Sequence, residues 1–192
     1  PLRYYLIKEV SFGNDGNISQ ERLEDCINSD LANNFGNLCQ RVTAFAIKNC
    51  EGNIPSNIEF NNDDLKILDK FKDNLDLIRK KIDELDLNYY IDFIVTTLFE
   101  TNKYFNDQEP WKKKDDLIRL NTIVYTTLEI VRKISYMLYP IIPQSSLNAL
   151  KIFSIGEKEI DFSSIGNHYY LKEGDKINKI NILFKKIEKN ND

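Results

Sequence analysis

The sequence predicts an all-α protein, a bundle of four or five helices joined by short loops. Glycine (7) and proline (5) are scarce among the 192 residues, which favours long uninterrupted elements. Apolar residues recur at spacings of three and four over several long stretches, as on one face of a helix. Hydrophobic and charged contents of 42% and 29% are ordinary for a globular protein, and the length suits one domain or one domain plus appendages.

The first elements lead into one long helix. Residues 2–10 are short and apolar-rich and predict a helix, whereas residues 11–18 are rich in Gly and Asn and predict a turn. Ser19 suits an N-cap, and the apolar stripe after it predicts an amphipathic helix that reaches about Asn49. The stripe comprises Leu23, Ile27, Leu31, Phe35, Leu38, Val42, Phe45 and Ala46.

Two further helices follow a loop over residues 52–62. Asp63 is the expected cap of the first, whose apolar face ends near Leu85 and whose other face is rich in Lys, Asp and Glu. The next helix is expected from about Asn88 to Tyr104.

Prolines and serines mark the expected ends of the last two helices. A helix is expected to begin after Pro110 and Trp111 and to stop at Tyr139, because a proline follows that tyrosine. Ser145 or Ser146 is expected to cap a final helix that reaches about position 153.

Beyond Gly156 the pattern changes. Turn signals alternate with short apolar runs, which predicts an irregular C-terminal segment that returns to the bundle. We therefore expect the bundle over residues 19–153, a preceding linker over 1–18, and a returning segment over 154–192.

Charge and cysteine usage exclude several classes of protein. With 26 basic and 30 acidic residues, the net charge of −4 argues against indiscriminate binding to nucleic acid or to an anionic membrane, but leaves room for a small local RNA site. Cys26, Cys39 and Cys50 form no C-x-x-C pair, and His168 is the only histidine, so a zinc site is not expected. The thiols fit a reducing cytoplasm. No stretch approaches 18 apolar residues, and we expect a cytosolic protein without a membrane segment.

The residues also argue against catalysis by this chain alone. The sequence has no Gly-rich phosphate loop, no H-E-x-x-H and no G-x-S-x-G motif. The acidic pairs at 63–64 and 115–116 stand at expected helix starts, where the helix dipole favours them structurally.

Asn37 and Arg41 form the first candidate binding pair. At ~100° per residue they lie within ~40° of each other on the long helix, beside its apolar seam. A guanidinium fork next to an amide can match the edge of a splayed-out base. The spacing alone favours the alternative interpretation, in which Asn37 and Arg41 are surface residues on a solvated helix face.

Trp111, the only tryptophan, is the second candidate. It follows Pro110 and precedes Lys112, Lys113 and Lys114, so its ring can stack on an unpaired base beside three cations. A Trp after a Pro at a helix entry also commonly anchors that entry to the core, and local chemistry favours this reading.

Four stretches carry a resemblance to the methionyl-tRNA synthetase family, and it covers essentially the whole chain. The segment over residues 2–16 resembles the one that follows the family's catalytic domain, and residues 27–38, continuing to Arg41, resemble its first anticodon helix. Asn102-x-Tyr104 followed by Pro110-Trp111, and the closing Leu183-Phe184-x-x-Ile187, also match. Lys185 departs from the family, which usually has proline there, and this puts the packing of the tail in doubt.

The resemblance implies the α-helical anticodon-binding domain of class I synthetases, entered through the tail of the stem-contact region over residues 1–18. It implies that Asn37, Arg41 and Trp111 read the CAU anticodon of methionine tRNA. Trp111 would stack on the first base, a cytosine, with Pro110 fixing its approach.

The resemblance further implies that the complete protein is a methionine–tRNA ligase that uses ATP and Mg²⁺. The ATP-binding signatures and the zinc-bearing insertion of the family are absent here, so no cofactor is expected in this segment, which looks like a piece cut just after the catalytic domain. The expected partners are methionine tRNA and that catalytic domain, in a cytoplasmic monomer. The alternatives are the anticodon domain of another class I synthetase and a helical scaffold that binds a protein and no RNA.

Overall fold

The computed structural model of the chain describes residues 1–10, 13–16 and 18–188, and its longest feature is one continuous helical rod. Ser19 caps this rod as predicted, because its hydroxyl accepts a hydrogen bond from the Arg22 amide at 3.2 Å. The middle of the rod is a π-helix, which the apolar periodicity did not predict. The rod consists of α2 (Gln20–Cys26), η1 (Ile27–Gly36) and α3 (Asn37–Asn49).

A short helix, α1 (Leu2–Glu9), precedes the rod as predicted and packs on α2 and α5. The turn expected over residues 11–18 includes positions 11, 12 and 17, which lie outside the described residues. Gly13 has a φ of +86°, a left-handed conformation that glycine adopts without strain.

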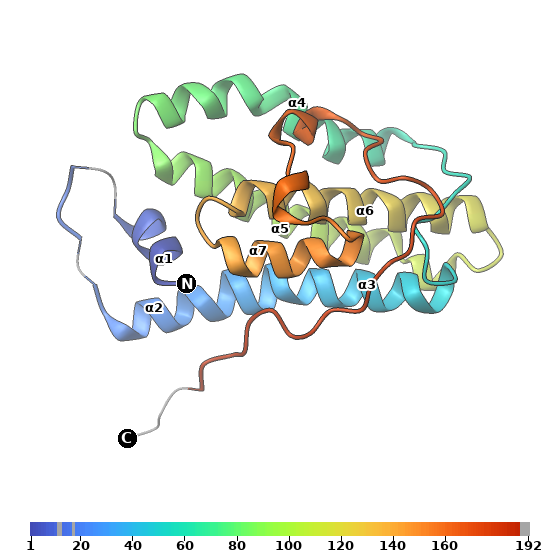
Figure 1. Ribbon diagram of the computed structural model, residues 1–192, viewed down its shortest axis with the longest axis horizontal. Coiled ribbons are helices and arrows are strands. Elements are labelled where there is room, and N and C mark those ends of the chain that lie inside the picture. The colour runs from blue at the N-terminus through green and yellow to red at the C-terminus, as the bar shows by residue number, and fades with distance from the viewer. Residues whose placement is uncertain (11–12, 17, 189–192) are drawn as a thin grey trace.

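The helices α4 (Asn62–Asp83) and α5 (Leu87–Gln108) form an antiparallel pair (Figure 1). The prediction that Asp63 caps α4 is wrong. Asn61 is the cap, because its side chain accepts from the amides of Asp63 and Asp64 at 2.9 and 3.2 Å, while Asp64 accepts from the Asn61 amide at 2.9 Å. Asp86 caps α5, which runs four residues beyond the predicted end.

The predicted start of the next long helix is also wrong. Pro110 begins a separate 3₁₀ turn, η2 (Pro110–Lys112), and α6 (Leu117–Leu138) starts only after Asp116, whose side chain accepts from the Arg119 amide at 3.0 Å. The predicted stop at Tyr139 is confirmed. The final helix, α7 (Pro143–Leu150), begins at its proline and not at Ser145 or Ser146.

The central helix of the fold is α6, which is buried on all sides from Thr122 to Leu138. It carries a buried ion pair in which Nη2 of Arg132 lies 2.5 Å from Oε1 of Glu129. Arg132 also donates to the Ser164 hydroxyl at 2.8 Å, and the Leu171 amide donates to Glu129 at 3.3 Å. These contacts fasten the later part of the chain to α6.

The chain after α7 is irregular, as predicted, with the 3₁₀ turns η3 (Lys151–Phe153), η4 (Glu157–Glu159) and η5 (Phe162–Gly166). It passes α4, where Nε2 of His168 lies 3.0 Å from Asp69, and then returns to the rod (Figure 1). Along the rod it runs antiparallel to α3 and η1, since Ile180 lies beside Ala44 and Phe184 beside Gly36.

Candidate nucleic-acid interface

The two candidate residues on the rod stand at the start of α3. Asn37 is its first residue, and Arg41 follows one turn later; both are half-buried. Nη2 of Arg41 donates a hydrogen bond to Oδ1 of Asn106 on α5 at 2.6 Å. Among the described residues, the side-chain amide of Asn37 has no hydrogen-bond partner, so it retains both a donor and an acceptor.

Trp111 lies on the turn that leaves α5. Glu109 ends that helix in a left-handed conformation, with φ of +45°, and the buried Pro110 opens η2 directly after it. Trp111 is 40% exposed, so it is not a buried core residue. One edge contact anchors it, since its centroid lies 6.2 Å from that of Phe105 at an interplanar angle of 64°.

Phe105 connects the two candidate positions. Its ring is buried and packs against Phe45 of α3 at 5.9 Å as well as against Trp111. The guanidinium carbon of Arg41 lies 5.6 Å from the same ring centroid, within the range of a cation–π contact. Arg41 and Trp111, which are far apart in the sequence, therefore share one buried platform.

Sequence reasoning singled out neither Phe105 nor Asn106. The available signal was their place in the sequence, a few residues before Pro110 and Trp111. Residues in the last turn of a helix lie close to the turn that follows it, so Phe105 and Asn106 were candidates for contact with Trp111.

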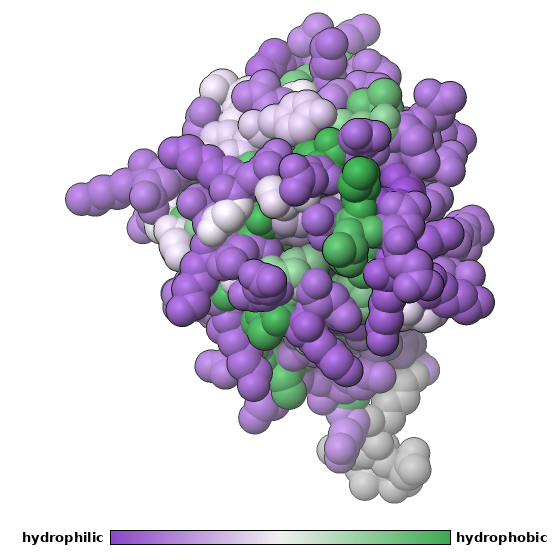
Figure 2. Space-filling view, turned by 90° about the vertical axis from the view of Figure 1, so that its right-hand side faces the viewer, coloured by the Kyte–Doolittle hydropathy of each residue, from purple (hydrophilic) through white to green (hydrophobic). Residues whose placement is uncertain are grey.

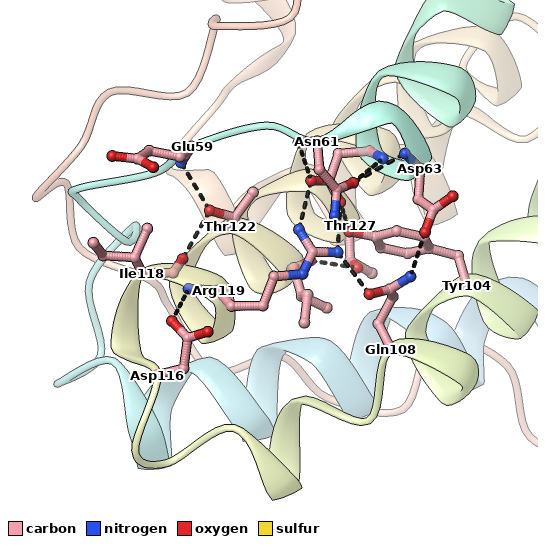
Figure 3. A network of polar contacts seen from close by, with 12 residues as sticks. Glu59, Asn61, Asp63, Tyr104, Gln108, Asp116, Ile118, Arg119, Thr122 and Thr127 are labelled. Atoms are coloured by element: carbon pink, nitrogen blue, oxygen red, sulfur yellow. Dashed lines mark hydrogen bonds and ion pairs between the residues drawn. The ribbon is translucent and has the colours of Figure 1, made fainter.

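A polar network fixes the end of α5 that carries this turn (Figure 3). Buried Asp64 receives two hydrogen bonds from Arg119, at 2.6 and 2.9 Å, and a third from the Tyr104 hydroxyl. Arg119 also donates to Gln108, the last residue of α5, at 2.7 Å. Burial, and then the negative charge of Asp64, raise the pKa of Tyr104 far above its usual range, so this hydroxyl remains a donor. The network joins α4, α5 and α6, and sequence reasoning read Asp64 only as a helix-start residue.

The lysines next to Trp111 offer less positive charge than their number suggests. Nζ of Lys112 lies 2.7 Å from Oε1 of Glu109. Within the described part of the chain, Lys113 and Lys114 have no ion pair. Four acidic residues, at positions 107, 109, 115 and 116, flank the three lysines.

The end of the bundle that bears η2 and the start of α6 is mostly hydrophilic, with smaller hydrophobic areas between the polar side chains (Figure 2). Leu117 and Ile118, the first two residues of α6, are among the exposed apolar side chains of the protein.

The thiols do not provide reactive groups. All three cysteines are free. Burial raises the pKa of Cys26 to about 12 and that of Cys50 to about 11, and it raises the pKa of Cys39 as well. Thiols with such values are not thiolates near neutral pH.

Across the described residues, no group of three or more His, Cys, Asp and Glu side chains is placed to hold a metal ion. Over the same residues, no helix combines the length and apolar character that a membrane crossing needs.

Two family models match the chain. The anticodon binding domain of methionyl-tRNA ligase matches residues 54–192, and the class I tRNA synthetase model of the methionine type matches residues 1–43. Asn37 and Arg41 fall in the second match, and Trp111 in the first.

Curated relatives agree with the family models. The chain is 39% identical over 165 residues to methionine–tRNA ligase of Brucella suis, which covers 85% of this chain and 32% of that protein. It is 36% identical over 189 residues to methionine–tRNA ligase of Thermotoga maritima, covering 97% of this chain and 30% of the relative. The chain thus spans about a third of the length of these relatives.

Solved structures share the fold. Free methionyl-tRNA synthetase of Mycobacterium tuberculosis superposes with a TM-score of 0.91 at 30% identity, over 98% of this chain and 39% of that one. The same enzyme bound to methionyl-adenylate gives a TM-score of 0.89 at 31% identity, over 96% of this chain and 37% of that one. The predicted all-α anticodon-binding bundle is therefore confirmed.

Proposed function

Because this chain belongs to the methionyl-tRNA ligase family and matches its anticodon-binding domain, we propose that it recognises the CAU anticodon of methionine tRNA. The supporting observation is the platform at Phe105. An exposed aromatic ring and a guanidinium fork meet on one buried side chain. Single-stranded bases are commonly held by stacking on such a ring and by hydrogen bonds to their edges.

Each candidate residue has a distinct role in this proposal. The open face of Trp111 stacks on the first anticodon base, a cytosine, and Pro110 fixes the approach of the ring. Arg41 and Asn37 hydrogen-bond to base edges. The contact with Asn106 occupies one of the five guanidinium donors of Arg41, so it orients the fork and leaves donors for a base.

The proposal extends to the protein that contains this domain. That protein is a methionine–tRNA ligase, which activates methionine with ATP and Mg²⁺ and transfers it to tRNA in the cytoplasm. The catalytic domain, with any zinc site, lies outside this chain, and this segment is not catalytic alone. It selects the tRNA as part of a monomer, with residues 1–18 as the tail of the stem-contact region, 19–153 as the bundle and 154–192 as the returning segment.

A titration with anticodon stem-loops tests the proposal. The chain should bind the CAU stem-loop of methionine tRNA more tightly than the same stem-loop with U in first position. Arg41→Ala should remove this preference, whereas Arg79→Ala, which changes an exposed arginine of α4, should retain it. Equal binding of both stem-loops by the unchanged chain would refute CAU recognition. No binding of either would favour the protein-binding scaffold.

A further inference from the structure

The π-helix η1 ends directly before Asn37. π-helices are rare, occur mostly as single turns, and are frequent at functional sites, whereas η1 extends over ten residues. The backbone amide of Asn37 itself donates to the carbonyl of Ala32, five residues earlier. The direction in which Asn37 projects therefore depends on the π-helical register before it.

The returning segment binds the first turn of η1 through Asn28. Nδ2 of Asn28 donates to the carbonyl of Ile187 at 2.9 Å, and the Ile187 amide donates to Oδ1 of Asn28 at 2.8 Å. One side chain thus satisfies both backbone groups of a residue 159 positions away.

The same segment binds the last turn of η1 through Phe184. Its ring lies 6.3 Å from that of Phe35. A Cβ at Gly36 would lie 3.3 Å from Cδ2 of Phe184 and 3.0 Å from the Leu31 carbonyl oxygen. Glycine at this position lets the Phe184 ring approach the backbone closely.

Other elements also contact η1. Asp30 accepts hydrogen bonds from Tyr4 and Lys8 of α1 at 2.9 and 2.7 Å, and Asn34 accepts one from Asn102 of α5 at 2.7 Å. Residues 183–187, which we call the strap, add the contacts with Asn28 at the start of η1 and with Phe35 and Gly36 at its end.

We propose that the strap holds η1 in its π-helical register and thereby positions Asn37 for base recognition. Asn28 and Phe184 are positioning residues in this inference, which rests on the proposed function. Without the strap, the outer turns of η1 return to ordinary α-helical bonding and Asn37 changes direction. Arg41 stays in place, because it contacts α5 and because α3 packs on α6.

A double-mutant cycle tests the strap. Asn28→Ala should weaken binding of the CAU stem-loop about five- to tenfold, the equivalent of one lost hydrogen bond to a base. Because Asn28 acts through Asn37, adding Asn28→Ala to Asn37→Ala should weaken binding no further. The matched control is Asn178→Ala, which removes two hydrogen bonds of the same segment, to Lys151 and Ser154, away from η1. It should bind as the unchanged chain does.

Amide hydrogen exchange supplies the structural readout. Asn28→Ala and the milder Phe184→Leu should both speed exchange across residues 27–37, and Asn178→Ala should not. Additive losses in the double-mutant cycle, or unchanged binding and exchange in the Asn28 and Phe184 variants, would overturn the strap. Failure of the proposed function gives a different pattern, in which Asn37→Ala and Arg41→Ala bind the CAU stem-loop as tightly as the unchanged chain.

Discussion

Replacing Phe105 by leucine removes the platform without emptying the core. The buried ring makes three specific contacts, with Phe45, with Trp111 and with the Arg41 guanidinium. Leucine keeps much of the apolar volume, so the expected cost comes mainly from these contacts and not from a large cavity.

The magnitude follows from the contacts. Each aromatic pair contributes roughly 0.5–1.5 kcal/mol beyond burial, and an exposed cation–π contact about 0.5–1 kcal/mol. We therefore expect Phe105→Leu to lower the free energy of unfolding by about 1.5–4 kcal/mol. The middle of that range lies below the roughly 3–5 kcal/mol typical of Phe→Ala in a core, and the domain should stay folded.

Urea unfolding followed by circular dichroism measures the change, with an unchanged m-value as the check that both states remain comparable. Phe99→Leu is the matched control, because Phe99 lies on the same helix but is 57% exposed. It should change stability by no more than about 0.5 kcal/mol. Phe105→Leu should also weaken binding of the CAU stem-loop. A stability loss no larger than that of the control, with binding intact, would refute the platform.

Three further predictions concern the surroundings of this platform and the core. Trp111→Ala should weaken CAU stem-loop binding about ten- to a hundredfold in a titration, since stacking contributes roughly 1–3 kcal/mol per base, while the domain stays folded; near-native binding would remove the stacking role. If Lys114 contacts a phosphate of the anticodon loop, Lys114→Gln should reduce the slope of log binding constant against log salt concentration by about 0.7, the single-strand value per phosphate; an unchanged slope would exclude the phosphate contact. Lys133 lies buried without a hydrogen bond, and burial lowers its pKa to about 8 in the folded chain, against about 10.4 when unfolded. Below pH 8 the lysine is charged in both states, so the full cost of burying its charge applies, and this cost shrinks as the pH rises toward 10. Lys133→Met should therefore stabilise the chain in urea unfolding, and this stabilisation should decline by up to about 1.4 kcal/mol per pH unit over that window. A difference in unfolding free energy between Lys133→Met and the unchanged chain that stays constant with pH would contradict the burial of a charged lysine.

The sequence predicted where the helices run and that Ser19 caps the rod, but not how α4, α6 and α7 begin. The stripe from Leu23 to Ala46 gave the rod correctly, because one face of it is buried. Asn61, Asp63 and Asp64 all suit a cap by residue type, and only the path of the incoming loop decides that Asn61 occupies the position. The late start of α6 has the same origin, since Asp116 caps it and leaves Trp111 on a turn of its own.

The π-helical part of the rod had no signal in the local sequence. Its register coincides with contacts from distant residues, such as Asn102 with Asn34 and Ile187 with Asn28. Apolar periodicity indicates only which face of a helix is buried. It does not identify the distant residues that contact that helix.

The candidate site was predictable as a set of residue types but not as an arrangement. Arg41 and Trp111 were singled out from their chemistry and from the family resemblance, whereas Phe105 looked like any other apolar residue of α5. Its role follows from the left-handed Glu109 at the end of that helix, after which the Trp111 ring packs against Phe105.

The central claim is that Trp111 forms one wall of a cytosine pocket. Since Trp111 is the only tryptophan, a ¹H–¹⁵N spectrum of the chain contains a single indole signal, which reports on this ring alone. Adding the CAU stem-loop should shift that signal upfield to saturation, because a stacked base shields it, and a stem-loop with U in first position should shift it far less at equal concentration. An indole signal that stays in place while other amides report binding, or one that moves equally with both stem-loops, would contradict the account.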